Sequence, residues 1–296
     1  SLLEQGDDVT VVDLQWFGNY LEAHPRLRVI KEDIRNAERL PFDGVEAVLH
    51  LANIANDPCS DLNSKLNWEV NALATMFLVE RAIAAGVPRF IFASSGSVYG
   101  VKDEPEVTED LSLVPISDYN KTKMISERVL LSYADRIHLQ IVRPATVCGY
   151  SPRMRLDVAV NMLTMQALAN GRITVLGGAQ TRPNIHIRDM VRVYHHFLAS
   201  GPEVQGIYNA GFENISILDI ANRVKERVPC EVAILESNDP RSYRLSSKRL
   251  LDTGFTPRYT VADGIQEVID AYKAGILKME DRYFNIKTMK QLGDLA

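Results

Sequence analysis

The chain has 296 residues, of which 46% are hydrophobic and 24% are charged, a composition typical of a soluble globular protein of one large or two modest domains. Its net charge of −5 argues against a general affinity for nucleic acid. Three widely spaced cysteines, Cys59, Cys148 and Cys230, match neither a disulfide framework nor a metal motif, so we expect a reducing, cytoplasmic environment and no metal. We expect neither a membrane-spanning segment nor a signal peptide.

Apolar strands alternate with helices along the first half of the chain. The pattern predicts strands at 9–13, 29–30, 47–52, 89–93 and 139–143 and helices at 66–85 and 119–133. Continuous apolar strands that alternate with helices are typical of a doubly wound parallel sheet buried on both faces. We therefore predict an α/β protein with a Rossmann-type domain over residues 1–148.

The pattern changes after Gly149, where 151–157 reads as a loop. Further on, we expect helices at 158–170 and 188–199 and strands at 173–176, 207–210 and 231–235. We predict that residues 149–296 form mostly a smaller substrate-binding domain, with 185–211 returning to the first domain. It would cap the carboxyl ends of the sheet strands, where ligands of open α/β sheets bind.

The cofactor half shows acids and apolar residues at strand ends. Asp13 ends the second strand of a Rossmann unit, where it would bind an adenosine ribose; no arginine follows directly, which favours NAD over NADP. The alternative is an ordinary strand-end aspartate. Asp33-Ile34 would border the adenine, and Leu51-Ala52 would follow the cofactor.

The glycine-rich phosphate loop is not where this pattern needs it. It should lie about 20 residues before the acid, whereas only twelve residues precede Asp13. We expect the first strand and its glycine turn to lie upstream of Ser1; otherwise the protein lacks its pyrophosphate cradle.

A serine followed 24 residues later by Tyr-x-x-x-Lys is the strongest chemical signal. Residues i and i+4 share one helix face, so Lys123 would lie beside the Tyr119 phenol. A nearby cation lowers the pKa of a phenol from about 10, which would make Tyr119 a usable general base. Ser95, at a strand end, could bind the same substrate oxygen. The trio suits proton removal from an alcohol while hydride leaves its carbon; the alternative is an exposed, lysine-rich helix face.

Taken in order, these residues resemble the extended short-chain dehydrogenase/reductase family, in its nucleotide-sugar epimerase/dehydratase branch. The resemblance runs from the second strand onward and rests on Asp13, Asp33-Ile34, Leu51-Ala52, Asn71, Ser94 to Gly100, Tyr119-x-x-x-Lys123, Arg143-Pro144-Ala145-Thr146, Arg182 to Ile187 and Asp239-Pro240-Arg241.

The resemblance implies NAD as cofactor and a nucleotide sugar as substrate. It implies Tyr119 as base, Lys123 as pKa modifier and ribose ligand, and Ser95 as alcohol ligand. Further cofactor contacts would come from Asn71, Ser94, Pro144 and Thr146.

The substrate contacts that the resemblance implies lie in the second half, apart from Ser97. Arg182 and Arg241 would clasp the diphosphate, with Asn161 nearby. Arginine suits phosphate because its planar fork donates two parallel hydrogen bonds. The alternative for each arginine is a solvated surface residue.

Departures from the family pattern narrow the reaction. Sugar-nucleotide dehydratases carry Thr-Asp-Glu where this chain has Ser95-Gly96-Ser97, so no carboxylate is available there to expel water. The same position argues against UDP-glucuronate decarboxylation. The asparagine beside the sugar in 4-epimerases is replaced at Thr146, so the sugar pocket differs.

The hypothesis that remains is hydride chemistry at one carbinol, C4, by an NAD-dependent nucleotide-sugar 4-epimerase or 4-dehydrogenase. An NAD(P)H-dependent ketosugar reductase would use the same residues. A non-catalytic NAD-binding protein of this fold is the alternative of another class. The helices at 66–85 and 119–133 are apolar on more than one face, which is typical of the family's four-helix homodimer interface; burial within one subunit would explain it too.

Overall fold

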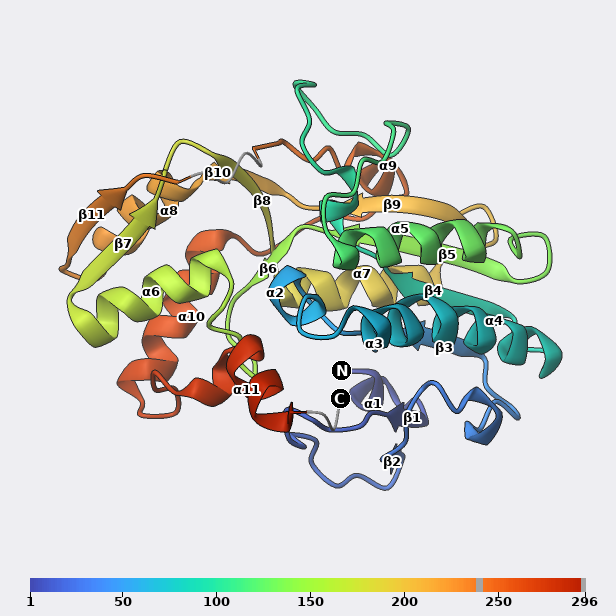
Figure 1. Ribbon diagram of the computed structural model, residues 1–296. Coiled ribbons are helices and arrows are strands. Elements are labelled where there is room, and N and C mark those ends of the chain that lie inside the picture. Colours follow the sequence, from blue (N-terminus) through green and yellow to red (C-terminus); the bar gives the residue numbers. More distant parts are fainter. Residues whose placement is uncertain (238–241, 294–296) are drawn as a thin grey trace.

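A computed structural model describes residues 1–237 and 242–293, and it shows a parallel sheet flanked by helices next to a second, smaller lobe (Figure 1). The first lobe contains the parallel strands β1 (Val9–Val12), β2 (Leu27–Ile30), β3 (Ala47–His50), β4 (Arg89–Ala93), β5 (His138–Pro144) and β9 (Gly206–Ala210). Strands β3, β4, β5 and β9 form one parallel sheet in that order, whereas β1 pairs with β2. The fold is α/β of Rossmann type, as the sequence predicts.

Continuous apolar runs explain the interior strands. Three consecutive residues of each strand, 90–92 of β4 and 139–141 of β5, are at most 1% exposed. Because successive side chains point to opposite faces, both faces of these strands are covered. The prediction of a fully buried strand at 47–52 is wrong: β3 ends at His50, and Leu51 is 45% exposed. Among the described residues, β3 pairs on one side alone, with β4, which leaves its other edge less covered.

Helices cover the sheet of the first lobe. These elements are α1 (Leu2–Gln5), α2 (Asp57–Ser60), α3 (Ser64–Trp68), α4 (Ala74–Ala84), α5 (Asp118–Leu131) and α7 (Ile187–Ala199), with short turns η1 (Ala37–Arg39), η2 (Glu69–Leu73) and η3 (Gly96–Tyr99). The helix expected at 66–85 is divided, because the π-helical η2 lies between α3 and α4. Ser117 caps α5 by accepting a hydrogen bond from the Asn120 amide.

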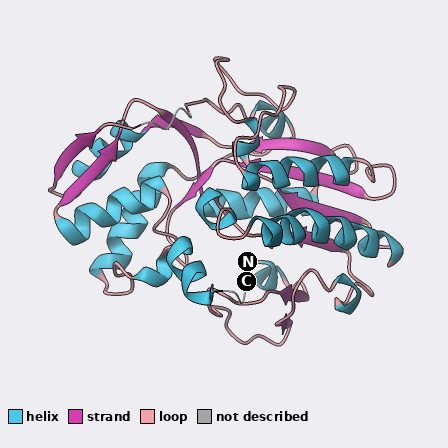
Figure 2. Ribbon diagram, in the orientation of Figure 1, coloured by secondary structure: helices cyan, strands magenta, loops and turns pink. Residues whose placement is uncertain are grey.

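The second lobe is built on two small sheets (Figure 2). Its elements are β6 (Thr146–Cys148), β7 (Arg172–Leu176), β8 (Thr181–His186), β10 (Glu213–Ser216), β11 (Glu231–Leu235), α6 (Ala159–Asn170), α8 (Ile217–Lys225), α10 (Val261–Lys273), η4 (Asp281–Tyr283) and α11 (Asn285–Leu292). The short helix α9 (Lys248–Asp252) lies back against β9 of the first lobe (Figure 1). Strands β10, β8 and β6 form one sheet, and β11 pairs in parallel with β7.

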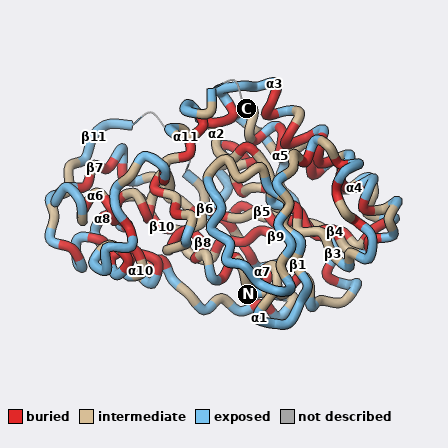
Figure 3. Tube along the Cα trace, turned by 90° about the horizontal axis from the view of Figure 1, so that it is seen from below, coloured by how far each residue is buried: buried red, intermediate tan, exposed pale blue. Residues whose placement is uncertain are grey.

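Both lobes have buried interiors, whereas β1, β2 and the loop between them carry mostly exposed and intermediate residues (Figure 3). The two lobes are tied together at α11, whose Met289 is 5% exposed and joins the same apolar cluster as Phe90 and Leu66. No helix in the part of the chain that the structure describes is both long and apolar enough to cross a membrane.

Candidate active site

The carboxyl end of β4 and the start of α5 bring the predicted trio together. Ser95 follows β4 and caps η3, while Tyr119 and Lys123 lie one turn apart on α5. The Ser95 hydroxyl is hydrogen-bonded to the Tyr119 phenol and lies 2.7 Å from the Ser97 hydroxyl oxygen. The spacing in the sequence therefore translates into one polar cluster, as expected.

Lys123 is buried beneath this cluster. Its Nζ donates a 2.7 Å hydrogen bond to the Ala93 carbonyl and lies 4.8 Å from the centre of the Phe92 ring. Burial lowers the pKa of Lys123 from 10.5 to about 7, although the Glu127 carboxylate opposes the shift. The lysine therefore exists in both charge states near neutral pH.

Tyr119 differs from the sequence-based expectation in its pKa. Burial raises the pKa of Tyr119 above 10, the Ser95 hydrogen bond and Arg155 act in the opposite direction, and Asp57 adds to the rise. The expectation that Lys123 lowers this pKa is wrong in this structure, because burial dominates and the ammonium is bonded to Ala93. Placement on one helix face was predictable, whereas the net electrostatic effect was not.

Three residues that sequence reasoning missed surround the phenol. Asp57 of α2 accepts a hydrogen bond from Ser117, the cap of α5. Arg155 comes from the loop between the lobes and is paired with Asp157 at 2.9 Å. Burial raises the pKa of Tyr194 on α7, and the charge of the nearby Tyr119 phenolate raises it further. For Arg155, the two arginines in the loop 151–157 were a signal that the sequence offered. Nothing in the local sequence marked Asp57 or Tyr194.

The loop that carries Arg155 depends on two backbone features. Gly149 has φ +104°, and a Cβ atom there would lie 2.9 Å from His186 Nε2, so glycine is required. Asn161, predicted to bind phosphate, is 2% exposed and its amide bonds the Gly149 amide at 3.0 Å and the Arg155 carbonyl at 3.0 Å. In this structure Asn161 therefore holds the loop that carries Arg155.

The predicted adenosine residues lie at the ends of β1 and β2. Asp13 is exposed and accepts a hydrogen bond from the Gln15 amide. Asp33 is held by Arg35 at 2.7 Å, which lowers the pKa of its carboxyl although burial opposes the shift. Ile34 is buried.

Two other predicted cofactor residues are buried and bonded to protein groups. The Asn71 amide bonds both the amide nitrogen of Ile54 at 2.8 Å and its carbonyl oxygen at 3.0 Å, so it clamps the loop after β3. Ser94 donates to Glu127, which is also paired with Arg143. Both side chains are therefore buried and support the loops and strand ends of the site through hydrogen bonds within the protein.

The remaining predicted residues lie on or beside strands β3, β5, β6 and β8. Ala52 and Pro144 are partly buried at the ends of β3 and β5, and Thr146 is partly exposed at the start of β6. Arg182 lies half-buried on β8, and its Nη1 donates to the Thr181 carbonyl at 3.3 Å. Arg241 lies outside the described residues.

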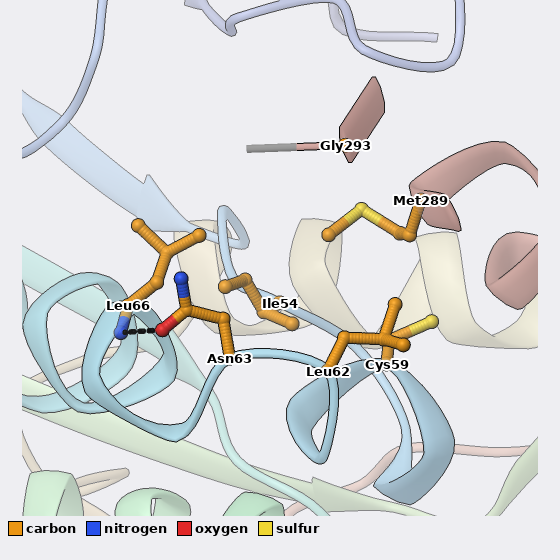
Figure 4. Close-up of a pocket in the computed structure, with 7 residues that line it drawn as sticks. All are labelled: Ile54, Cys59, Leu62, Asn63, Leu66, Met289 and Gly293. Atoms are coloured by element: carbon orange, nitrogen blue, oxygen red, sulfur yellow. Dashed lines mark hydrogen bonds between the residues drawn. The ribbon is translucent and has the colours of Figure 1, made fainter. Parts of the chain in front are cut away.

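A small cavity of about 60 Å³ separates the loop after β3 from α11 (Figure 4). It is lined by Ile54, Cys59, Leu62, Asn63, Leu66, Met289 and Gly293. Burial raises the pKa of the Cys59 thiol to about 11, so this cysteine is not a reactive thiolate. The cavity has room for only a few atoms and is a packing void, not the site of a nucleotide.

The residues present fit a dinucleotide across the carboxyl edge of the strands. Asp13 is exposed for a ribose, and the Nζ of Lys123 reaches from α5 to the end of β4. Among the described residues, the buried Asn53 Oδ1 on the loop after β3 has no hydrogen-bond partner, which leaves an acceptor for a ligand donor.

Comparison with known proteins defines the class. The chain belongs to the NAD dependent epimerase/dehydratase family, whose family model matches residues 1–211. NAD is accordingly its cofactor.

Relatives within this family differ in their reactions. A UDP-glucose 4-epimerase of Corynebacterium glutamicum is 27% identical over 88% of this chain and 86% of its own length. The structure is similar to that of MoeE5 in complex with UDP-glucuronic acid and NAD (TM-score 0.80, 27% identity, 93% of each chain). It is also similar to DesIV, a dTDP-glucose 4,6-dehydratase from Streptomyces venezuelae with NAD and TYD bound (TM-score 0.81, 25% identity, 92% of each chain). The chain is thus similar to NAD-dependent nucleotide-sugar epimerases and dehydratases alike.

Proposed function

We propose that this protein oxidises the C4 carbinol of a nucleotide sugar with NAD, as a 4-epimerase or a 4-dehydrogenase. The observation that carries the proposal is the Tyr119 hydroxyl bonded to Ser95 at the end of β4, one helical turn from the buried Lys123. This arrangement offers a base and a hydroxyl to one substrate oxygen.

The protein residues would divide the work as follows. Tyr119, as phenolate, takes the proton of the sugar hydroxyl, and Ser95 hydrogen-bonds the same oxygen. Arg155 favours the phenolate, because its charge lowers the pKa of Tyr119 against the effect of burial. Bound NAD would supply the hydride acceptor.

The turn after β4 supports simple oxidation over dehydration. Gly96 stands where a dehydratase of the family carries an acid, and a Cβ atom there would lie 3.2 Å from the Pro144 carbonyl oxygen and 3.6 Å from the Tyr243 hydroxyl. A side chain at this position would therefore press against the Pro144 carbonyl, which would have to shift by a few tenths of an ångström. The similarity to a UDP-glucose 4-epimerase and to MoeE5 with UDP-glucuronic acid supports a UDP-hexose or UDP-uronic acid as the first candidate.

Product analysis of a Tyr119→Phe variant tests the proposal. The protein with NAD is incubated with UDP-, dTDP-, GDP- and CDP-sugars, and the products are identified by proton NMR. We expect an epimer or a 4-ketosugar from the wild type and none from Tyr119→Phe, which should still bind NAD. The matched control is Tyr133→Phe just beyond α5, whose hydroxyl bonds Glu80 at 2.7 Å and which should retain turnover.

Other outcomes would point elsewhere. Turnover only with a ketosugar and NAD(P)H would make the protein a reductase. NAD binding without turnover of any sugar would favour a non-catalytic role.

We also propose a homodimer through the helices of the first lobe. An apolar groove of about 370 Å³ runs over α3, η2 and α4 and along α5, lined by Lys65, Trp68, Glu69, Ala72, Leu73, Met76, Ile125 and Val129. Leu73 is 46% and Phe77 40% exposed. A second copy of this face would cover them, as the four-helix interface expected from the sequence requires.

A further inference from the structure

A chain of hydroxyl groups connects the Tyr119 phenol to a buried amide. The Ser95 Oγ bonds the phenol and lies 2.7 Å from Ser97 Oγ, and Ser97 in turn donates to Asn120 Oδ1. Asn120 directly follows Tyr119 on α5, yet its side chain is 0% exposed and turns back to η3. The phenol and the amide are therefore the two ends of one hydrogen-bond chain.

The direction of this chain depends on the charge of the phenol. A hydroxyl has one proton to donate. Because Ser97 donates to Asn120, Ser95 must donate to Ser97, and the Ser95 oxygen is left to accept from a neutral Tyr119. A phenolate needs the reverse: Ser95 must donate to Tyr119, and Ser97 to Ser95.

Asn120 has the group that the reversed chain needs. Its Nδ2 is buried and has no hydrogen-bond partner among the residues that the structure describes. A half-turn about the Cβ–Cγ bond exchanges Nδ2 and Oδ1 without changing the shape of the side chain. Nδ2 would then donate to Ser97, so the amide gains a partner when the phenol loses its proton.

We propose that Asn120 is a positioning residue whose amide reverses the Ser97–Ser95 chain and so stabilises the phenolate form of Tyr119. The relevance to catalysis depends on the proposed function, whereas the hydrogen-bond chain does not. An apolar side chain at position 120 could not donate a hydrogen bond to Ser97. The reversed chain, in which Ser97 donates to Ser95 and Ser95 to the phenolate, would then lack its donor.

Other charged and titratable groups also act on the phenol and must be kept constant. Asp57 from α2 and Arg155 from the loop between the lobes change the pKa of the phenol, Tyr194 of α7 responds to its charge, and Lys123 lies one turn away on α5 itself. An uncharged substitution at position 120 changes none of them.

The test is a titration of Tyr119 in the free protein, with no need for turnover. The tyrosines are labelled with ¹³C at Cζ, and the Tyr119 signal is assigned by its loss in Tyr119→Phe. We expect Asn120→Leu, which has nearly the same shape, to raise the pKa of Tyr119 by about half a unit to one unit, which is about a three- to tenfold loss of phenolate at a given pH.

Two further variants separate the chain from a general effect on packing. In a Ser97→Ala background the chain is cut, so Asn120→Leu should no longer change the pKa of Tyr119. Asn67→Leu is the matched control, because Asn67 is also 0% exposed with an unpartnered Nδ2 among the described residues but bonds Ser60 and Asn71 instead. It should leave the pKa of Tyr119 unchanged.

An unchanged pKa in Asn120→Leu, or the same rise in the Ser97→Ala background, would overturn the proposal. If Asn120→Leu does not fold, Asn120→Ala replaces it, since it removes the amide without adding a charge and should also raise the pKa of Tyr119, with most of the rise lost when Ser97 is alanine. Absence of turnover with every sugar would refute the proposed function and leave this result intact.

Discussion

Replacing Lys123 by methionine should stabilise the protein while removing its activity. The pKa of Lys123 falls from 10.5 to about 7, a difference of about 3.5 units, because the side chain is buried. At about 1.4 kcal/mol per unit, protonated Lys123 is disfavoured by about 5 kcal/mol. Loss of its hydrogen bond to Ala93 offsets about 2 to 3 kcal/mol of this. We expect Lys123→Met to raise the free energy of unfolding by about 2 kcal/mol at pH 6.

The pH dependence distinguishes this explanation from better packing. Below pH 7 the lysine is protonated in both the folded and the unfolded chain, so the full penalty applies. Between about 7 and 10.5 the unfolded chain binds more protons, so wild-type stability rises with pH and the difference from Lys123→Met narrows.

Urea denaturation of both proteins from pH 6 to pH 9.5 measures this difference. The control is Lys121→Met, which removes an exposed lysine paired with Asp118 at 3.1 Å and should show no comparable pH dependence. The explanation would be contradicted if Lys123→Met were less stable than the wild type at pH 6, or if the difference in free energy of unfolding between the two proteins were the same at every pH.

Three further changes test the supports of the site. Asn71→Ala removes the clamp on Ile54, and we expect a loss of about 1 to 3 kcal/mol in urea denaturation and weaker NAD binding in calorimetry. Glu127→Gln leaves the buried Arg143 without its counter-charge and should reduce the free energy of unfolding by about 3 to 5 kcal/mol, again measured with urea. Ile125→Asp places a charge in the apolar groove and should yield monomers in analytical ultracentrifugation.

Each of these expectations has a contrary result. NAD binding as tight as in wild type would mean that the Asn71 clamp does not shape the cofactor loop. An unchanged urea midpoint in Glu127→Gln would show that the Arg143 charge is compensated elsewhere. A wild-type protein that is already monomeric would refute the proposed homodimer.

The sequence predicted the strands of the main sheet because their apolar runs are long and uninterrupted. The strand at 89–93 has the predicted limits, and 207–210 joins the sheet beside β5 as expected. The i, i+4 spacing also placed Tyr119 and Lys123 on one helix face. Local pattern was sufficient for these features, since burial and helical periodicity are encoded in neighbouring residues.

The electrostatics of the site could not be predicted in the same way. The pKa of Tyr119 depends on burial and on Asp57 and Arg155, which lie 62 and 36 positions away in the chain numbering. The resemblance marked Asn71 and Asn161 but could not tell that their amides bond loop backbone. Such contacts depend on the tertiary fold, which no local pattern records.

The most direct test of the proposed C4 oxidation uses UDP-glucose and UDP-glucuronic acid carrying deuterium at C4, with NAD and the protein, followed by NMR. We expect either an epimer that keeps deuterium at C4 or a 4-ketosugar with deuterium on the nicotinamide. Deuterium recovered at C6 of a 4-keto-6-deoxy product would contradict the proposed function, because that transfer is the mark of a 4,6-dehydratase.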